Sequence, residues 1–236
     1  MTNSFARVAI ALTVVAVASI TLANRFSSSS ALAAGPSAVP APVVDNALAA
    51  APGQETAVFA GGCFWGIQAV YQHVKGVKSA VSGYAGGHVN APSYEQVSSG
   101  ATGHAESVRV VFDPSQVSYG TLLRVFFAVA HDPTQLNRQG PDVGTQYRSE
   151  IFYTNDAQKK IASAYIDQLT KAKVFTKPIV TRVSSLNAFN VAEEYHQNYA
   201  NVHPNDPYIR FNDAPKVEAL KTDFSPLYKA ELSAWK

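Results

Sequence analysis

The fold is decided by residues 56–74, which read TAVFAGGCFWGIQAVYQHV. The first five, Thr56–Ala60, are mostly apolar and predict a strand. Two glycines follow, and glycine permits the tight backbone that a strand-to-helix turn requires. Apolar residues then recur with helical spacing, at Cys63, Ile67, Val70, Tyr71 and Val74. The stretch therefore predicts a strand, a glycine turn and a helix whose apolar stripe begins at Cys63 and faces a sheet.

Strands and helices alternate further along the chain. Strands are predicted at Val77–Tyr84, Ala105–Phe112, Tyr147–Tyr153 and Pro178–Val183, and helices at Tyr119–Ala130, at Asp156–Lys171 with Asn155 or Thr154 as its cap, and shortly after Asn190. Four prolines beyond Asn201 predict a mostly irregular tail. This order, with its unequal connections, favours an α+β fold: a two-layer sandwich with a ferredoxin-like split βαβ core. A doubly wound sheet is the alternative.

Composition excludes several classes of protein. The 236 residues hold 19 Lys and Arg, 17 Asp and Glu, and one Cys. Arg7 and Arg25 lie in the first 33 residues, which hold no acid, so the remainder is neutral and argues against nucleic-acid binding. A single Cys excludes an internal disulfide, a four-Cys zinc site and a CxxC redox pair. The histidines are not spaced as metal ligands, so no metal is predicted.

The N-terminus has the pattern of an export signal, residues 1–34. Arg7 supplies a positive charge, residues 8–23 are uncharged, and Ala31-Leu32-Ala33 fits a cleavage site. The uncharged stretch is shorter than the roughly 20 residues of a membrane span, and an uncleaved anchor is the alternative. Residues 35–54, rich in Ala and Pro, predict a flexible linker, and residues 55–236 a single catalytic domain. We therefore expect an exported protein, periplasmic or extracellular.

Cys63 is the strongest candidate for chemistry. It follows a glycine turn at a predicted helix N-terminus, where unpaired N–H groups and the helix dipole favour thiolate, the nucleophilic form. A small buried hydrophobe is the structural alternative. Phe64 and Trp65 come next and either pack in the core or form the wall of a pocket for an apolar group.

Glu106 is the candidate acid. Strand alternation places it on the face of Val108, Val110 and Phe112, which is apolar. A carboxyl in such surroundings has a raised pKa and can donate a proton near neutral pH. The alternative is that Glu106, close to the strand's end, simply reaches water.

A long polar loop runs from His131 to Gln146 and leads into the predicted strand at Tyr147. Long loops in compact domains are often functional. Tyr147, together with the earlier Tyr94, offers hydroxyl donors, although tyrosines are commonly part core and part surface.

Five motifs in order and spacing closely resemble the A-type peptide methionine sulfoxide reductases. They are GGCFWG, SGYAGG, YEQVSSGATGHAE, HDPTQLNRQGPDVGTQYRS and AEEYHQNY, and the resemblance covers Thr56–Pro207. It implies the α+β sandwich inferred above. It also implies reduction of the S epimer of methionine sulfoxide, free or in proteins, as a form of protein repair under oxidative stress.

The resemblance assigns roles to individual residues. Cys63 corresponds to the nucleophile that attacks the sulfoxide sulfur, and Glu106 to the acid that protonates the sulfoxide oxygen. The remaining positions are Tyr94 and Tyr147, which bind that oxygen, Asp142, a polar residue near the site, and Phe64 and Trp65, which hold the methyl group. His196 and Tyr199 lie in the last motif without an assigned role.

The chain departs from many members in having no cysteine after Cys63. Those members use further cysteines near the C-terminus to resolve the sulfenic acid. Here the resemblance implies a one-Cys enzyme with no bound cofactor, whose sulfenic acid is reduced by an external thiol, either a thioredoxin-like protein or a small molecule. We expect a monomer. Two other hypotheses are a different thiol enzyme, such as a peroxidase or Cys hydrolase, and a non-catalytic exported binding module.

Overall fold

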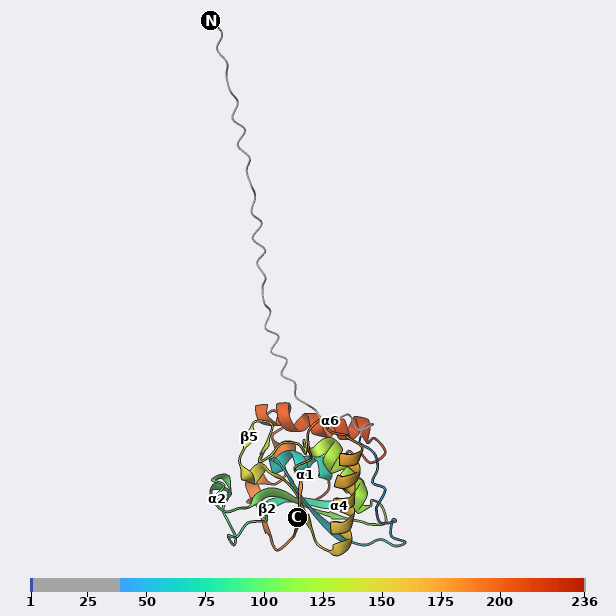
Figure 1. Ribbon diagram of the computed structural model, residues 1–236. Helices are drawn as coiled ribbons and strands as arrows, with labels where there is room; N and C mark the ends of the chain where they lie inside the picture. Colours follow the sequence, from blue (N-terminus) through green and yellow to red (C-terminus); the bar gives the residue numbers. More distant parts are fainter. Residues whose placement is uncertain (2–38, 236) are drawn as a thin grey trace.

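The computed structural model describes Met1 and residues 39–235 (Figure 1). Apart from Met1, the predicted export signal lies outside the described residues, as do residues 35–38 of the predicted linker. No helix in the described part of the chain has the length and apolar character needed to cross a membrane.

One six-stranded sheet forms the centre of the molecule. Its strands, in spatial order, are β7 (Arg182–Ser185), β6 (Ser149–Tyr153), β1 (Glu55–Gly61), β3 (Ala105–Phe112), β2 (Val77–Ala85) and β8 (Phe189–Val191). β3 lies between β1 and β2 and is antiparallel to both, while β6 pairs antiparallel with the other edge of β1. The four central strands thus have the split βαβ order, which confirms the predicted ferredoxin-like core. Within this six-stranded sheet, β6 and β7 are the one pair of strands that run in parallel, so the doubly wound alternative is wrong.

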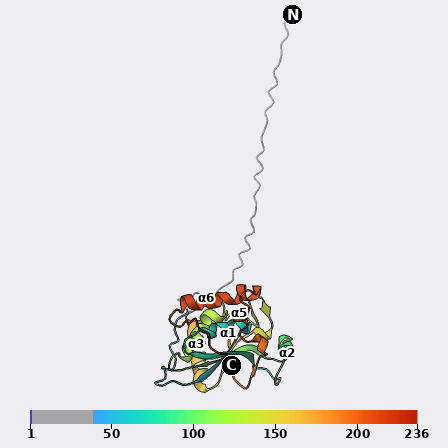
Figure 2. The ribbon, with the colours of Figure 1, turned by 180° about the vertical axis from the view of Figure 1, so that it is seen from behind.

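Most helices gather over one face of this sheet. They are α1 (Phe64–Gln72), α3 (Tyr119–Val125), α4 (Asp156–Lys171), α5 (Tyr199–Val202) and α6 (Ala214–Asp223), whereas α2 (Tyr94–Ser98) projects beside the sheet (Figure 1). In Figure 1, α6 lies across the top and α1 lies between it and the sheet. The reverse view in Figure 2 shows α3 beside α1 on the same side of the sheet.

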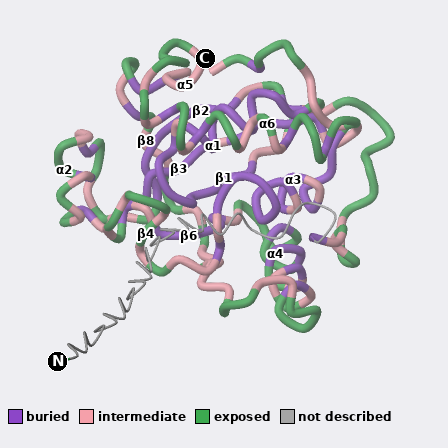
Figure 3. Tube along the Cα trace, turned by 90° about the horizontal axis from the view of Figure 1, so that it is seen from above, coloured by how far each residue is buried: buried purple, intermediate pink, exposed green. Residues whose placement is uncertain are grey.

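The main core fills the space between the sheet and these helices, along the buried strands and α1 in Figure 3. β3 contributes Val108, Val110 and Phe112, the face on which alternation placed Glu106. The predicted stripe on α1, headed by Cys63, is buried throughout. The sequence period therefore located the inner face of both elements correctly.

Several predicted boundaries are wrong. The predicted strand at Pro178–Val183 begins later, as β7 at Arg182, because the Val180 N–H bonds the Pro133 carbonyl instead of the sheet (2.8 Å). β8 follows it and was not predicted. Tyr147 lies in a short 3₁₀ turn, Thr145–Tyr147, and the strand that follows begins at Ser149.

The tail is not irregular, contrary to the prediction. α6 packs on α1. Leu220 of α6 and Phe224, the residue that follows the helix, are buried in the main core. Pro215 lies in the first turn of α6, where the missing N–H costs no hydrogen bond. The proline therefore marks the start of a helix.

Residues 39–54 pack against the domain, although a flexible linker was predicted. Val39 is fully buried, and the Tyr165 hydroxyl of α4 donates to the Pro40 carbonyl at 2.6 Å. Asp45 accepts from the Gly120 N–H in the first turn of α3 at 2.9 Å. These contacts join the segment to α3 and α4, so the packed structure extends before residue 55.

Candidate active site

Cys63 lies at the turn between β1 and α1 and is the N-cap of α1. Gly62 has a φ of 103°, and a Cβ there would lie 2.5 Å from the Gln139 side chain. The turn therefore requires glycine for both its conformation and its close approach to the 131–146 loop. It presents Cys63 with only 8% of its surface exposed.

The surroundings of Cys63 raise the pKa of its thiol and so disfavour thiolate. Burial raises the pKa of Cys63 well above its usual value, and the negative charges of Glu106 and Asp213 raise it further. The Trp65 N–H and the Lys216 ammonium lower it by less. A first-turn N–H therefore favours thiolate, as expected of a helix N-terminus, but desolvation of the thiol outweighs it. When Glu106 is protonated, one of the two negative charges that raise the pKa of Cys63 is absent.

Glu106 is buried beside Cys63 in a way that favours its neutral form. Only 2% of its surface is exposed, so the alternative in which it reaches water is wrong. The N–H of Phe64, the residue after the thiol, donates to Glu106 Oε2 at 3.1 Å. Burial is the main cause that raises the Glu106 pKa to about 8, against the lowering effect of this bond. Near neutral pH the carboxyl is mostly protonated and can donate its proton.

Phe64 and Trp65 form an aromatic wall next to the thiol. Phe64 is buried, with its ring centroid 5.0 Å from that of His196. Trp65 is half-buried, stacks on Tyr199 at 3.8 Å and donates its indole N–H to His196 Nδ1 at 3.2 Å. Tyr208 meets the Trp65 ring edge-on at 5.9 Å. Phe64 lies in the core and Trp65 packs against it, which confirms the core interpretation, while the pocket wall stays a prediction.

Tyr94 and Tyr147 lie near Glu106, as the resemblance requires. Both are half-buried. Burial raises the pKa of each phenol, and the Glu106 charge is the next cause in both cases. Tyr94 begins α2, and its N–H donates to Glu193 Oε1 at 2.8 Å. Both phenols thus remain protonated over the physiological range and can serve as hydrogen-bond donors.

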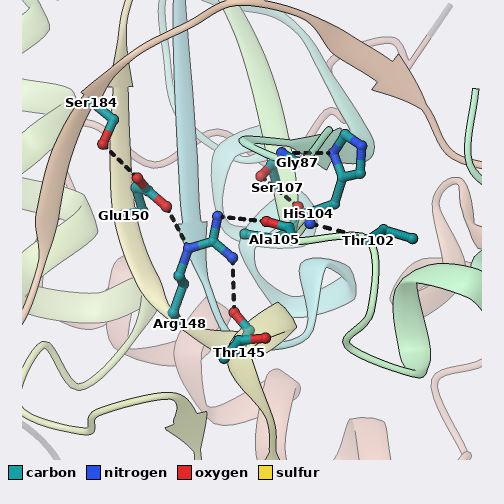
Figure 4. Close-up of polar contacts among 10 residues, drawn as sticks. Gly87, Thr102, His104, Ala105, Ser107, Thr145, Arg148, Glu150 and Ser184 are labelled. Carbon is teal, nitrogen blue, oxygen red and sulfur yellow. Dashed lines mark hydrogen bonds and ion pairs between the residues drawn. The ribbon is translucent and has the colours of Figure 1, made fainter. Parts of the chain in front are cut away.

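Arg148 joins the turn that carries Tyr147 to the loop that precedes Glu106 (Figure 4). Its guanidinium donates to the Thr145 carbonyl at 3.0 Å and to the Gly103 carbonyl at 3.1 Å. Tyr147 and Glu106 come from segments about 40 residues apart in sequence, and the Arg148 guanidinium bridges these two segments.

The same guanidinium is neutralised by a buried carboxylate. Arg148 Nε pairs with Glu150, which also accepts from the Ser184 hydroxyl of β7 at 2.6 Å. Close by in Figure 4, His104 accepts from the Gly87 N–H at 3.2 Å, which ties the ends of β2 and β3 together. These contacts link β6 to β7 and join the segments that flank β2 and β3.

Asp142 is linked to the site by its contact with Tyr208. It belongs to β5 (Asp142–Val143), which pairs with β4 (Arg138–Gln139) in a small hairpin of the long loop. The Tyr208 hydroxyl donates to Asp142 Oδ2, and burial of the carboxyl raises its pKa. Tyr208 in turn contacts Trp65.

Sequence analysis missed Tyr208, Asp213 and Lys216. Asp213 is buried, pairs with Lys216 at 3.0 Å, and raises the pKa of Cys63. Only the spacing of an acid and a base three residues apart marks this pair in the sequence, and such spacing is common on helices. Their place beside the thiol follows from the packing of α6 on α1.

The structure gives little support to a Cys-His hydrolase. Within the described residues, no hydrogen bond joins a histidine to Cys63. His131 binds the Phe126 carbonyl and the Ser149 hydroxyl, and His196 accepts from Trp65. Residues 39–235 also hold no group of three His, Cys, Asp or Glu side chains that could bind a metal ion.

A protonated carboxyl and two phenols beside a thiol suit a reaction in which a ligand oxygen is protonated while the sulfur attacks. Fold and site thus define an α+β protein with a buried thiol beside a proton donor. The family profile of peptide methionine sulfoxide reductase matches residues 55–227. The chain belongs to this family and reduces methionine sulfoxide to methionine.

Relatives and solved structures agree. The chain is 61% identical over 179 residues to a peptide methionine sulfoxide reductase MsrA 2 of Mesorhizobium japonicum, covering 76% of this chain and 92% of the relative. It is 50% identical over 195 residues to a peptide methionine sulfoxide reductase MsrA 2 of Synechocystis, covering 82% of this chain and 91% of the relative. It is similar to Mxr1 of Saccharomyces cerevisiae in reduced form, with a TM-score of 0.57 and 31% identity, covering 68% and 94%. It is also similar to methionine sulfoxide reductase A of Corynebacterium diphtheriae, with a TM-score of 0.55 and 35% identity, covering 71% of this chain and 84% of that structure.

Proposed function

We propose that Cys63 performs the reduction by attack on the sulfoxide sulfur, with Glu106 as the proton donor. The observation that carries this assignment is the bond from the Phe64 N–H to Glu106 at 3.1 Å. It places a buried carboxyl with a pKa of about 8 next to the residue that follows the thiol. A sulfoxide sulfur becomes electrophilic when its oxygen is protonated or strongly hydrogen-bonded.

The reaction balances without a cofactor. The sulfur of Cys63 attacks the sulfoxide sulfur while Glu106 and the phenols of Tyr94 and Tyr147 supply a proton and hydrogen bonds to the oxygen. The thiol proton and a proton from Glu106 join the oxygen, which leaves as water as the S–O bond breaks and an S–S bond to Cys63 forms. Water then attacks the Cys63 sulfur and returns a proton to Glu106. The S–S bond breaks, methionine leaves as a thioether, and Cys63 becomes a sulfenic acid. The substrate sulfur is reduced and the Cys63 sulfur is oxidised.

The same arrangement distinguishes the two epimers. Phe64 and Trp65 present an apolar wall to the S-methyl group, while Glu106, Tyr94 and Tyr147 receive the S=O group. Exchanging the oxygen for the lone pair would leave these buried donors without an acceptor, and unpaired buried polar groups are costly. We therefore propose the S epimer as the substrate, free or in proteins.

Single-turnover methionine release tests the assignment. Each separated epimer is mixed with the reduced enzyme in the absence of any reductant. We expect one methionine per enzyme from the S epimer only, with loss of the free thiol, and none from Cys63→Ser. Release by Cys63→Ser, or equal release from both epimers, would refute the proposed chemistry.

The enzyme needs an external reductant, because no second cysteine follows Cys63. We propose that a thiol attacks the sulfenic acid and forms a mixed disulfide, which a second thiol then reduces. Mass spectrometry of the oxidised enzyme after addition of a thiol would detect the mixed disulfide on Cys63.

We also propose export, with cleavage near residue 34, and a monomeric enzyme. The positive residue, uncharged stretch and small-x-small site support the export proposal. The mass of the mature protein from cell fractions tests it, because an intact N-terminus in a membrane fraction would show an anchor instead. Sedimentation velocity of the mature chain tests the monomer.

A further inference from the structure

Cys63 is one of the residues that line a cleft. The cleft has a volume of about 680 Å³ and is lined by Cys63, by the 128–141 segment and by the start of the tail between Tyr208 and Lys216. Its lining does not include Glu106, Tyr94, Tyr147, Phe64 or Trp65. The cleft therefore borders Cys63 through side chains other than those proposed to hold the sulfoxide.

The lining of the cleft is cationic, whereas the chain as a whole is nearly neutral. Three cations contribute to it, Arg138, Lys177 and Lys216, against one carboxylate, Asp132. Asp132 is satisfied locally, by the N–H and hydroxyl of Thr134 and the amide of Gln135, with bonds of 2.7–3.0 Å. The cleft thus presents an excess of positive charge next to the thiol.

Two of these cations have no acidic partner in the described part of the chain. Lys216 pairs with Asp213, but neither Arg138 nor Lys177 lies within ion-pair distance of a carboxylate among residues 39–235. Both side chains are exposed at the cleft, and Arg138 donates one bond to the Gly140 carbonyl at 2.7 Å. They are available to an anionic ligand.

Resting on the proposed function, we propose that this cleft is the binding site for the reductant, a small thiol that carries carboxylates, held by Arg138 and Lys177. Pockets for small ligands commonly have volumes of roughly 300–1,000 Å³, which suits a peptide-sized thiol. Carboxylates of the ligand meet the two free cations while its sulfur faces Cys63.

The chemistry of the second half-reaction fits this placement. A thiolate attacks divalent sulfur along the line of the bond that breaks, so the entering thiol and the leaving oxygen occupy different sides of Cys63. The thiolate forms an S–S bond, the S–O bond breaks, and the oxygen leaves as water with a proton supplied by Glu106. A second thiol then releases the Cys63 thiol and forms the small disulfide. The small thiols are oxidised and the sulfenic sulfur is reduced.

The positive lining assists in a second way. The attacking form is the thiolate, and nearby cations favour thiolate over thiol. A small thiol bound between Arg138 and Lys177 therefore becomes more reactive as well as more concentrated. Both effects weaken as added salt screens the charges.

The test separates the two half-reactions. Each protein is first given one equivalent of sulfoxide, and methionine release and sulfenic acid are quantified. Glutathione, which has two carboxylates, or neutral 2-mercaptoethanol is then added, and loss of the sulfenic acid is timed. Rates are compared per thiolate. Failure of the first step would refute the proposed function, whereas failure of the second with a normal first step would refute only this site.

We expect glutathione to react faster than 2-mercaptoethanol in the wild type and with saturation. Arg138→Gln with Lys177→Gln should lower the ratio of the two rates roughly tenfold, since each exposed ion pair contributes modestly. The matched control Arg182→Gln with Lys171→Gln removes the same charges outside the cleft and should keep the ratio. An equal rate for both thiols, or an equal loss in the two double variants, would overturn the proposal.

A protein reductant is the competing outcome. Leu136 and Phe211 line the cleft and are exposed, and a docked protein would contact them. Reduction by thioredoxin that exceeds reduction by glutathione, falls in Phe211→Ala and is unchanged in the Arg138 and Lys177 double variant would overturn the small-thiol site.

Discussion

The Phe64 N–H donates to Glu106 Oε2 at 3.1 Å, which joins the first turn of α1 to the second residue of β3. The N–H groups of a first helical turn have no partner within the helix, and here a carboxyl from the sheet accepts one of them. The bond fixes the acid relative to the thiol, because Phe64 follows Cys63 directly. The N-terminus of α1, which carries the thiol, and the proposed proton donor are thus joined by a hydrogen bond.

Glu106→Gln should slow single-turnover methionine release from the S epimer by roughly 10²–10⁴-fold, the usual worth of a positioned acid. The amide keeps the shape of the side chain but cannot donate an acidic proton. In the wild type the rate should fall as pH rises through about 8, where the Glu106 carboxyl ionises. Stopped-flow mixing with rapid quench measures both, and Glu95→Gln, an exposed position on α2, serves as the control. A variant with the wild-type rate would exclude Glu106 as the acid.

The same substitution should change the pH dependence of stability. The folded pKa of Glu106, about 8, lies above its ordinary value of 4.5, so the folded state binds the proton more tightly than the unfolded state. This carboxyl's contribution is therefore complete below the ordinary pKa and is lost as pH rises from 4.5 to 8. Glu106→Gln should gain stability relative to the wild type between these values, as urea unfolding at about pH 5 and about pH 8 would show. A constant difference would contradict the raised pKa.

Tyr94→Phe and Tyr147→Phe should each slow methionine release by roughly 10²-fold, comparable to loss of one donor to a developing charge. Both phenols lie close enough to Glu106 for its charge to raise their pKa values. Tyr153→Phe is the control, because Tyr153 ends β6 away from the thiol. If both variants keep the wild-type rate, the sulfoxide oxygen binds elsewhere.

Much of this site follows from local sequence patterns. Alternation along β3 placed Glu106 on the buried face, and α4 spans Asp156–Lys171 with Asn155 as its cap, as predicted. The protonation state of Cys63 could not be predicted in the same way. Its pKa depends on burial and on Asp213, which lies far along the chain in the tail. The tail was predicted wrongly for the same reason, because α6 is weakly amphipathic and gains its stability from packing on α1.

Gly62→Ala should destabilise the protein by about 2–4 kcal/mol, because a positive φ and a clash with the Gln139 side chain add together. Gly100→Ala measures the effect of the positive φ alone. Gly100 also has a positive φ, of 76°, but a Cβ at this position would lie 3.5 Å from its nearest neighbour, so we expect about 1 kcal/mol. Urea denaturation compares the two. Equal losses would show that the approach of the 131–146 loop to the turn is not tight.

Arg148→Met should cost about 3–5 kcal/mol, because it leaves Glu150 buried without its partner. Replacing both residues by methionine should cost less than the single change, since no uncompensated charge then remains in the protein.

The Arg148→Met enzyme should also release methionine more slowly, because the guanidinium no longer ties the Thr145 carbonyl to the Gly103 carbonyl. Denaturation of the two single variants and the double variant gives the coupling energy, and single-turnover kinetics on the same proteins reports on the site. The exposed pair Lys221 and Glu218 is the control, and Lys221→Met should cost less than about 1 kcal/mol. If stability recovers in the double variant while the rate stays low, Arg148 positions the Tyr147 turn as well as neutralising Glu150; recovery of both would reduce its role to charge balance.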